Sequence, residues 1–374
     1  MRILWIMAKW LLLIGALLGL AVIAFVRLHP VFGGSPDAAS LEKIRRSPQF
    51  DGKVFVNLEP TEVQVQQDND ADRPGVLKWI RSVTSPPPGK QPAEPLPSEQ
   101  PDLSRLTDRH FVWLGHSSLL FNLGGKMVVT DPVFHRASPV FLGGAPFAMT
   151  HTPGVADLPE KIDIVLISHD HYDHLDYQAI VDLKDRVARF YVPLGVKAHL
   201  QRWGVADDKI IEMDWHETAT QDGLHITLLP ARHFSGRGLT NRNSTLWGAW
   251  AVKSADFSVY FNGDSGYGKH FAQIGAQYGP FDIAFMENGA YNQAWPQIHM
   301  FPEQSAQALS DIHAKVGVPI HWAKFDLSFH TWKDPINRFT QAAQGKPYQV
   351  ATPKIGEVFG MDDLPKDRWW EGVK

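Results

Sequence analysis

The part of this sequence best suited to chemistry is a short run with three histidines and two aspartates, His169-Asp-His171-Tyr-Asp173-His174. It follows the apolar residues 162–167, whose β-branched composition and short length predict a buried strand. Side chains two residues apart point to the same side of an extended chain, so His169 and His171 can approach one point. The loop then turns Asp173 and His174 toward a neighbouring point. Because imidazole and carboxylate groups are common metal ligands, this spacing predicts two adjacent metal ions.

Three further apolar runs are each followed by one residue of a metal-ligating type, namely His233, Asp264 and His321. Strand exits in one sheet sandwich lie along one edge, so these side chains are expected to converge with the first run. We predict three ligands for each metal and one carboxylate that bridges them. The first metal is assigned His169, His171 and His233, the second is assigned Asp173, His174 and His321, and the bridge is assigned to Asp264.

The amino-acid composition limits which metal ions and which binding partners are expected. The chain has no cysteine, which excludes thiolate ligands, disulfides and a cysteine nucleophile. A site built from histidine and carboxylate suits two Zn²⁺ ions best, with Mn²⁺ or Fe²⁺ as alternatives where carboxylate character rises. The formal net charge of -4 gives no electrostatic case for nucleic acid as a partner.

Apolar runs separated by turn residues predict a long series of strands. These cover residues 111–114, 118–121, 126–130, 162–167, 189–192, 209–213, 224–229, 248–252, 258–262, 283–286 and 319–320. Helical patterns are clearest at 177–183 and at 302–314, where a proline and a glutamate open the first turn. Many strands followed by inserted helices predict an α/β (α+β) fold in which two sheets are covered by outer helices, rather than a purely parallel sheet.

The N-terminus forms a separate apolar segment. No charged residue occurs from Trp10 to Val26, a stretch closer to the ~20 residues of a membrane helix than to the ~7–15 of a signal-peptide core. We expect residues 1–30 to be an uncleaved single-pass membrane anchor, with a removable signal segment as the alternative. Basic residues flank both ends, and the favoured orientation places the main domain outside the cytoplasm, in the periplasm.

Residues 31–105 are expected to be an extension rather than a second enzyme domain. They contain an acidic patch at 68–72, a brief strand at 54–56 and a helical turn at 75–81. The prolines from residue 86 to residue 101 exclude helix and central strand, so this stretch should run extended along a surface or serve as a spacer. The main domain then covers residues 106–374.

Several finer motifs accompany the candidate ligands. They are Trp113-Leu-Gly-His116-Ser, Thr130-Asp131-Pro132, His169–Asp176, Pro230-Ala-Arg-His233, Leu246-Trp247-Gly-Ala-Trp250, Gly263-Asp264-Ser-Gly, Tyr291–Glu303 and Ile320-His321-Trp322. Over roughly residues 108–360 this pattern resembles the metallo-β-lactamase superfamily, and within it the branch of N-acyl-phosphatidylethanolamine-hydrolysing phospholipase D and bacterial RomA-type proteins. The resemblance implies a four-layer αββα sandwich. The cysteine ligand of the best-known true metallo-β-lactamases is missing, so antibiotic hydrolysis is not the implied activity.

The resemblance also suggests roles for residues around the metals. Gln297 and His299 fall where the family places substrate-handling residues. Because the ligand positions are already filled, His116 and Asp131 are expected to support the ligands, with Asp131 accepting a hydrogen bond from a liganding histidine. The alternative for Asp131 is a structural turn before Pro132.

Three residues outside the ligand set have two interpretations each. Arg237 and Arg242, near His233, could steady a substrate phosphate or lie in a solvated loop. His330 could approach the pocket or simply be packed.

Two metals ~3.5–4 Å apart would hold a bridging water and lower its pKa, which supplies a hydroxide nucleophile. The predicted catalytic residues are Asp173, Asp264 and His299, with a proton for the leaving group coming from near Asp173, from His299 or from water. The favoured function is a membrane-associated phospholipase D-like phosphodiesterase acting on N-acyl-phosphatidylethanolamine-type or related phospholipids. The alternatives are an ester, lactone or thioester hydrolase, a nuclease, and a non-catalytic metal-binding membrane regulator.

Overall fold

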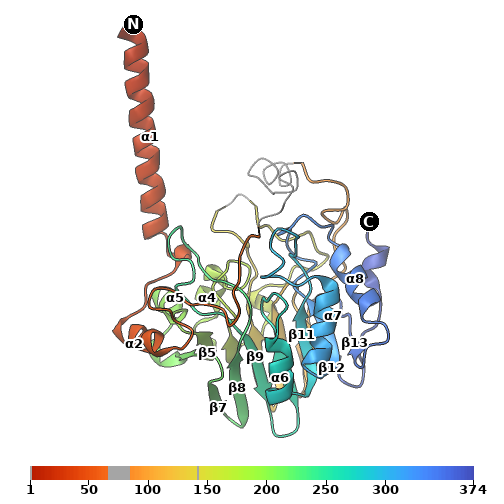
Figure 1. Cartoon of the computed structure of the whole chain (residues 1–374). Helices are drawn as coiled ribbons and strands as arrows, with labels where there is room; N and C mark the ends of the chain where they lie inside the picture. The colour runs from red at the N-terminus through yellow and green to blue at the C-terminus, as the bar shows by residue number, and fades with distance from the viewer. Residues whose placement is uncertain (1, 66–84, 141–142) are drawn as a thin grey trace.

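Two seven-stranded sheets stack face to face in the computed structural model, which describes residues 2–65, 85–140 and 143–374 (Figure 1). The first sheet has the order β14 (Val358–Gly360), β1 (His110–Trp113), β2 (Leu119–Leu123), β3 (Lys126–Thr130), β4 (Ile162–Leu166), β5 (Val187–Pro193) and β6 (Ile210–Met213). The second has the order β13 (Gln349–Val350), β12 (Ala314–Ile320), β11 (Phe281–Glu287), β10 (Ser258–Phe261), β9 (Ala249–Lys253), β8 (Leu224–Leu229) and β7 (Thr218–Gln221). Both sheets mix parallel and antiparallel pairs.

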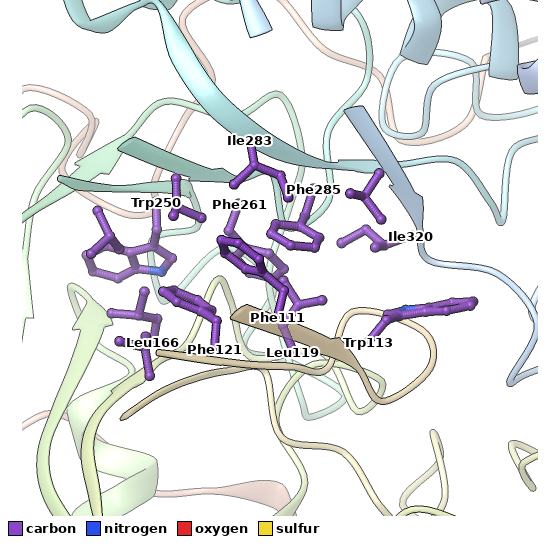
Figure 2. Close-up of a cluster of buried hydrophobic side chains, with 14 of the residues drawn as sticks. Phe111, Trp113, Leu119, Phe121, Leu166, Trp250, Phe261, Ile283, Phe285 and Ile320 are labelled. Carbon is purple, nitrogen blue, oxygen red and sulfur yellow. The ribbon is translucent and has the colours of Figure 1, made fainter. Parts of the chain in front are cut away.

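Apolar side chains from the two sheets meet in one buried layer (Figure 2). Phe111 of the first sheet and Phe285 of the second have ring centroids 5.6 Å apart, and both are fully buried. Burying a side chain of this size contributes roughly 1.5–3 kcal/mol. Val112 points to the opposite face of β1 and is also buried, which explains why the strands read as continuous apolar runs rather than alternating ones.

Helices cover the outer faces of both sheets. On the first sheet, α4 (Tyr177–Leu183) and α5 (Lys197–Arg202) share a core with the strands that includes Ile180, Leu200 and Val165. On the second sheet, α6 (His270–Tyr278), α7 (Pro302–Asp311) and α8 (Asp334–Ala342) pack over residues such as Met286. The predicted four-layer αββα sandwich is therefore confirmed.

Every strand expected within residues 106–374 overlaps an observed strand, and helix 177–183 is confirmed. The expected helix 302–314 is wrong at its end, because α7 stops at Asp311 and Ala314 already begins β12. His313 between them has φ 58°, a left-handed conformation that a continuing helix does not allow. Short elements without a strong pattern were missed, namely β7, β13, β14, α2 (Ala38–Arg46), α5, α6 and α8.

The described parts of the 31–105 extension lie on the main body. Residues 54–56 form only an isolated bridge, Phe50 to Phe55, instead of the expected brief strand, and Phe55 is fully buried. The proline-rich stretch runs extended along the surface, where Leu96 N donates to Ala148 O and Glu99 N donates to Ile355 O. The acidic patch at 68–72 and the expected helical turn at 75–81 lie outside the described residues.

Helix α1 (Arg2–Leu28) projects away from the body (Figure 1). By length and composition, its span Trp5–Leu28, with a mean hydropathy of 2.6, is the one segment in the described part of the chain able to cross a membrane. The hairpin that joins β7 to β8 lies at the opposite end of the molecule, so α1 leaves from the side toward which the C-terminal end of β8 points.

Candidate metal centre

The predicted ligands meet at the edge formed by strand ends. The loop His169–His174 follows β4, and His233, Asp264 and His321 follow β8, β10 and β12. β8, β10 and β12 run in the same direction within the second sheet, which brings their C-terminal ends to one place. Every second strand of this sheet therefore ends at the same edge, and the polar residue just beyond each of these strands contributes a side chain to the site.

One donor group consists of His169, His171, His233 and Asp264, with ligand-type atoms all within 4.8 Å of one another. Nδ1 of His171 lies 2.8 Å from Nε2 of His169 and 3.2 Å from Nε2 of His233. Oδ2 of Asp264 lies 3.8 Å and 3.6 Å from the same two Nε2 atoms. Three imidazoles and one carboxylate thus face a common point.

A second donor group consists of His116, Asp173, His174 and His321. Oδ2 of Asp173 lies 3.5 Å from Nε2 of both His174 and His321. Nε2 of His116 lies 3.0 Å from the same carboxylate oxygen, so this residue stands among the candidate ligands instead of behind them. The geometry allows His116 to bind a metal directly or to hold Asp173.

Asp264 connects the two groups. Its Oδ1 lies 3.1 Å from Nε2 of His174 and 3.0 Å from Nε2 of His321, while its Oδ2 faces the first group. A carboxylate placed in this way can bridge two cations.

Hydrogen bonds behind the site hold the imidazoles in place. His174 Nδ1 donates to Asp131 Oδ2 over 2.6 Å, and His233 Nδ1 donates to Ile298 O over 2.8 Å. Ser168 Oγ donates to Asp131 and lies 2.9 Å from Nδ1 of His169, which can donate to it. The bonds to His174, His233 and His169 each occupy Nδ1 and leave Nε2 directed into the site, as binding of a metal through Nε2 needs.

The donor set fits divalent cations. Nε2 of His174, Nε2 of His321 and Oδ1 of Asp264 are buried and form no well-aligned hydrogen bond among the described residues, although both nitrogens lie within 3.1 Å of that oxygen. Buried polar atoms without partners are costly, and a metal ion would satisfy all three. Neutral imidazole and carboxylate, with no thiolate, are the ligands expected for Zn²⁺ and similar ions.

The electrostatics of the two groups differ. Burial and the neighbouring imidazoles lower the pKa of His169 well below its ordinary value, and burial likewise lowers that of His233. Burial opposes charge on His321 as well, but the carboxylates of Asp264 and Asp173 raise its pKa to about 10. The same carboxylates raise the pKa of His174 against the effect of burial. In the second group, the imidazoles of His174 and His321 therefore hold protons that a metal ion would have to displace on binding.

Glu287 is a site residue that sequence reasoning missed. It lies at the end of β11, is fully buried, hydrogen-bonds to Nδ1 of His299 and accepts from Ser265 N at 2.7 Å. Together with Asp264, His299 and His321 it forms a third cluster of ligand-type atoms. Its position directly after the expected strand 283–286 repeats the pattern of His233, Asp264 and His321, and this signal could have found it.

A cavity of about 300 Å³ opens at the metal centre. Its polar lining includes His171, Asp173, Asp264 and His299. Its walls are largely apolar and are formed by Val63, Phe234, Ala290, Trp295, Ile298 and Leu327. The site therefore combines ionic groups at one end with an apolar approach.

The remaining predicted substrate residues lie elsewhere. Gln297 Oε1 accepts from Glu62 N and from Arg232 Nη2, and Gln297 does not line the cavity. Arg237 is buried and binds backbone carbonyls, while exposed Arg242 lies over the Phe234 ring. His330 stacks on Tyr291 and lines a small neighbouring cavity with His116 and His321. Of the expected substrate residues, the structure brings only His299 to the centre.

Several known proteins are similar to this chain in sequence. The β-lactamase superfamily domain matches residues 126–322. An uncharacterized Mycobacterium tuberculosis protein is 41% identical over 89% of this chain and 90% of its own length. The N-acyl-phosphatidylethanolamine-hydrolyzing phospholipase D 1 of Caenorhabditis elegans is 30% identical over 84% of this chain and 95% of its own. Outer membrane protein RomA of Klebsiella pneumoniae is 51% identical over 27% of this chain and 75% of its own.

A solved structure extends the match to the fold. The metallo hydrolase Igni18 of Ignicoccus hospitalis superposes with a TM-score of 0.51 at 22% identity, covering 67% of this chain and 97% of its own. Together with the sheet order and the two donor groups, these matches show that the chain belongs to the β-lactamase superfamily of metal-dependent hydrolases.

Proposed function

We propose that this protein is a membrane-anchored, phospholipase D-like phosphodiesterase that cleaves N-acyl-phosphatidylethanolamine-type or related phospholipids. The observation that carries the proposal is the cavity at the metal centre, where ionic groups meet apolar walls. A phospholipid has the same two parts, a charged phosphodiester and long hydrocarbon chains. The similarity to a relative named for hydrolysis of such a lipid supports the same substrate class.

The chemistry would be hydrolytic. When bound, two divalent metals, which we propose to be Zn²⁺, would supply a nucleophilic water at neutral pH and offset charge that develops on the phosphate oxygens. His169, His171 and His233 would hold one ion, Asp173, His174 and His321 the other, and Asp264 would bridge them. Asp131 would keep His174 oriented through its 2.6 Å hydrogen bond.

His299 would supply the proton for the leaving alkoxide. Burial lowers the pKa of His299 to about 4, so its imidazole is neutral at pH 7. Burial and the nearby Asp264 carboxylate raise the pKa of Glu287, which keeps a proton on that acid. Glu287 then donates to Nδ1 of His299, and the proton on Nε2 is available to the leaving oxygen while that of Glu287 moves to Nδ1.

The hydrocarbon part of the substrate would lie along apolar residues beside the centre. A second cavity of about 610 Å³ shares Trp295 and Leu327 with the first and adds Pro92, Phe147 and Phe329. Lys90, Gln91 and Asp326 also line the second cavity, so a hydrocarbon chain would lie along its apolar side, which the two cavities share through Trp295 and Leu327.

The N-terminal helix supports a location of the metal centre near a lipid surface. α1 leaves the body on the side toward which the metal-bearing strand ends point (Figure 1). We propose that α1 is an uncleaved anchor and that the domain is extracytoplasmic, consistent with the outer-membrane name of one relative. A C-terminal alkaline phosphatase fusion tests the side: activity is expected, and an inactive, stably expressed fusion would place the domain in the cytoplasm.

The function is tested with vesicles of phosphatidylcholine that contain N-acyl-phosphatidylethanolamine, analysed by mass spectrometry. Wild type and the control Asp222→Asn, which changes an exposed aspartate paired with Lys126, should both release phosphatidic acid and N-acylethanolamine. Asp264→Asn should release neither. Asp264-dependent release of fatty acid and lysophospholipid would instead establish an ester hydrolase, and no product from metal-loaded wild type would favour the non-catalytic regulator.

A further inference from the structure

The junction between α1 and the main domain is docked on the body instead of hanging free. It consists of residues 29–34, here named the junction segment, and includes a short 3-10 turn at Pro30–Phe32. Its carbonyl groups accept hydrogen bonds from three domain side chains. Trp203 Nε1 donates to Pro30 O over 2.7 Å, Arg237 Nε to Val31 O over 3.0 Å, and Arg202 Nη1 to Gly33 O over 2.6 Å.

Arg237 joins this segment to the metal-binding loop. While its Nε holds Val31, its Nη1 donates to Asp170 O over 2.7 Å and to Leu175 O over 2.6 Å. Asp170 lies between two candidate ligands, and Leu175 follows directly after His174. One buried guanidinium thus ties the junction segment to both ends of the loop that carries four of the seven proposed metal ligands.

His199 provides a second, separate connection. Its Nδ1 accepts from Gly34 N over 3.0 Å, so the proton resides on Nε2, which donates to Asp170 Oδ2 over 3.2 Å. The other oxygen of Asp170 accepts from Gly236 N over 2.7 Å. Asp170 and His199 are both buried, and the Asp170 side chain is therefore fixed between the junction segment and the loop after β8.

Two glycines make the close approach possible. A Cβ on Gly33 would lie 2.0 Å from Nδ1 of His199, and a Cβ on Gly34 would lie 2.2 Å from the carbonyl oxygen of Ala198. Gly34 does not have a left-handed conformation, so only this contact opposes a larger residue there. A linker that did not contact the domain would not require glycine at either position.

We propose that the junction segment is a structural part of the metal centre, with Arg237 and His199 as positioning residues. The docked segment holds the loop His169–His174 in its ligating shape, and detaching it weakens metal binding and lowers kcat. The inference rests on the metal centre proposed above and is independent of the substrate. It also assigns Arg237 a role other than binding substrate phosphate.

The test uses the full-length chain in detergent micelles, with Zn²⁺ affinity measured by competition with a chelator. Gly34→Ala and Arg202→Ala should detach the segment without touching the loop, because exposed Arg202 donates to Gly33 O and Leu28 O. Gly372→Ala is the matched control because a Cβ there meets nothing within 4 Å. Hydrogen–deuterium exchange of residues 29–34 reports detachment, and thermal unfolding reports folding. Both detaching variants should fold, exchange faster over residues 29–34, and lose about 10- to 100-fold in Zn²⁺ affinity, as removal of supporting contacts does in other metal sites.

The alternatives give different results. Faster exchange with wild-type Zn²⁺ affinity would show that the segment is only a tether and would overturn the proposal. Unchanged exchange in Gly34→Ala would also contradict it, because the segment would then not depend on the close contact. Failure of the wild type itself to bind Zn²⁺ would reject the metal centre, a result distinct from either of these.

Discussion

Oδ1 of Asp264 lies 3.0 Å from Nε2 of His321, while Oδ2 of the same carboxylate lies 3.6 Å from Nε2 of His233. One side chain therefore faces both donor groups. This arrangement makes Asp264 the residue on which a two-metal site depends most directly.

Asp264→Asn should reduce bound metal below two ions per chain and lower kcat by at least about 100-fold, because the amide offers one weaker oxygen ligand in place of two anionic ones. Metal content is measured by inductively coupled plasma mass spectrometry on the same samples used for kinetics. Asp222→Asn should leave both quantities unchanged. Two metals with full activity in Asp264→Asn would rule out the bridging role.

Asp131→Asn should weaken metal binding about 10- to 100-fold, because the hydrogen bond that orients His174 would lose its charge. The asparagine is nearly isosteric, so the fold should be retained. A chelator competition measures the affinity, and circular dichroism verifies folding. A folded variant with wild-type affinity would show that Asp131 serves only the turn before Pro132.

Glu287→Gln should lower kcat for substrates with a poor leaving group and spare those with a good one. The amide can still hydrogen-bond to His299, but it cannot pass on a proton. The comparison uses an alkyl phosphodiester and a p-nitrophenyl phosphodiester with otherwise equal structure. Equal losses on the two substrates would mean that Glu287 only shapes the site.

Metal binding should release protons at neutral pH. The carboxylates of Asp264 and Asp173 raise the pKa of His321 to about 10, so its imidazole carries a proton at pH 7 that a cation must displace. Because the metal-free site binds more protons than the metal-bound site, Zn²⁺ affinity should rise with pH up to about 10 and fall as pH decreases. Isothermal titration calorimetry in buffers of different ionisation enthalpy should show about one proton or more released at pH 7. The same binding enthalpy in every buffer would contradict this.

The sequence was sufficient to predict the two-sheet architecture and the convergence of the ligands. Buried strands leave strong apolar runs, and a polar residue just beyond such a run must lie at the edge of a sheet. The same logic identifies Glu287, which directly follows the expected strand 283–286. Short helices such as α5 lack the length for a clear periodic pattern, which explains why they were missed.

Contacts between distant segments could not be read from the sequence. The position of Arg237 near His233 in the chain predicts either a contact with substrate phosphate or a solvated loop. Its actual partners include Val31, a residue of the N-terminal segment whose docking depends on tertiary packing. The sequence predicts His116 behind the ligands, whereas its side chain reaches Asp173 within the second donor group.

Hydrolysis of N-acyl-phosphatidylethanolamine in ¹⁸O-labelled water tests the central claim most directly, because it shows which atom the water attacks. Attack at phosphorus should place one ¹⁸O atom in the phosphatidic acid and none in the N-acylethanolamine. Recovery of the label in a free fatty acid, with the phosphodiester intact, would contradict the phosphodiesterase assignment.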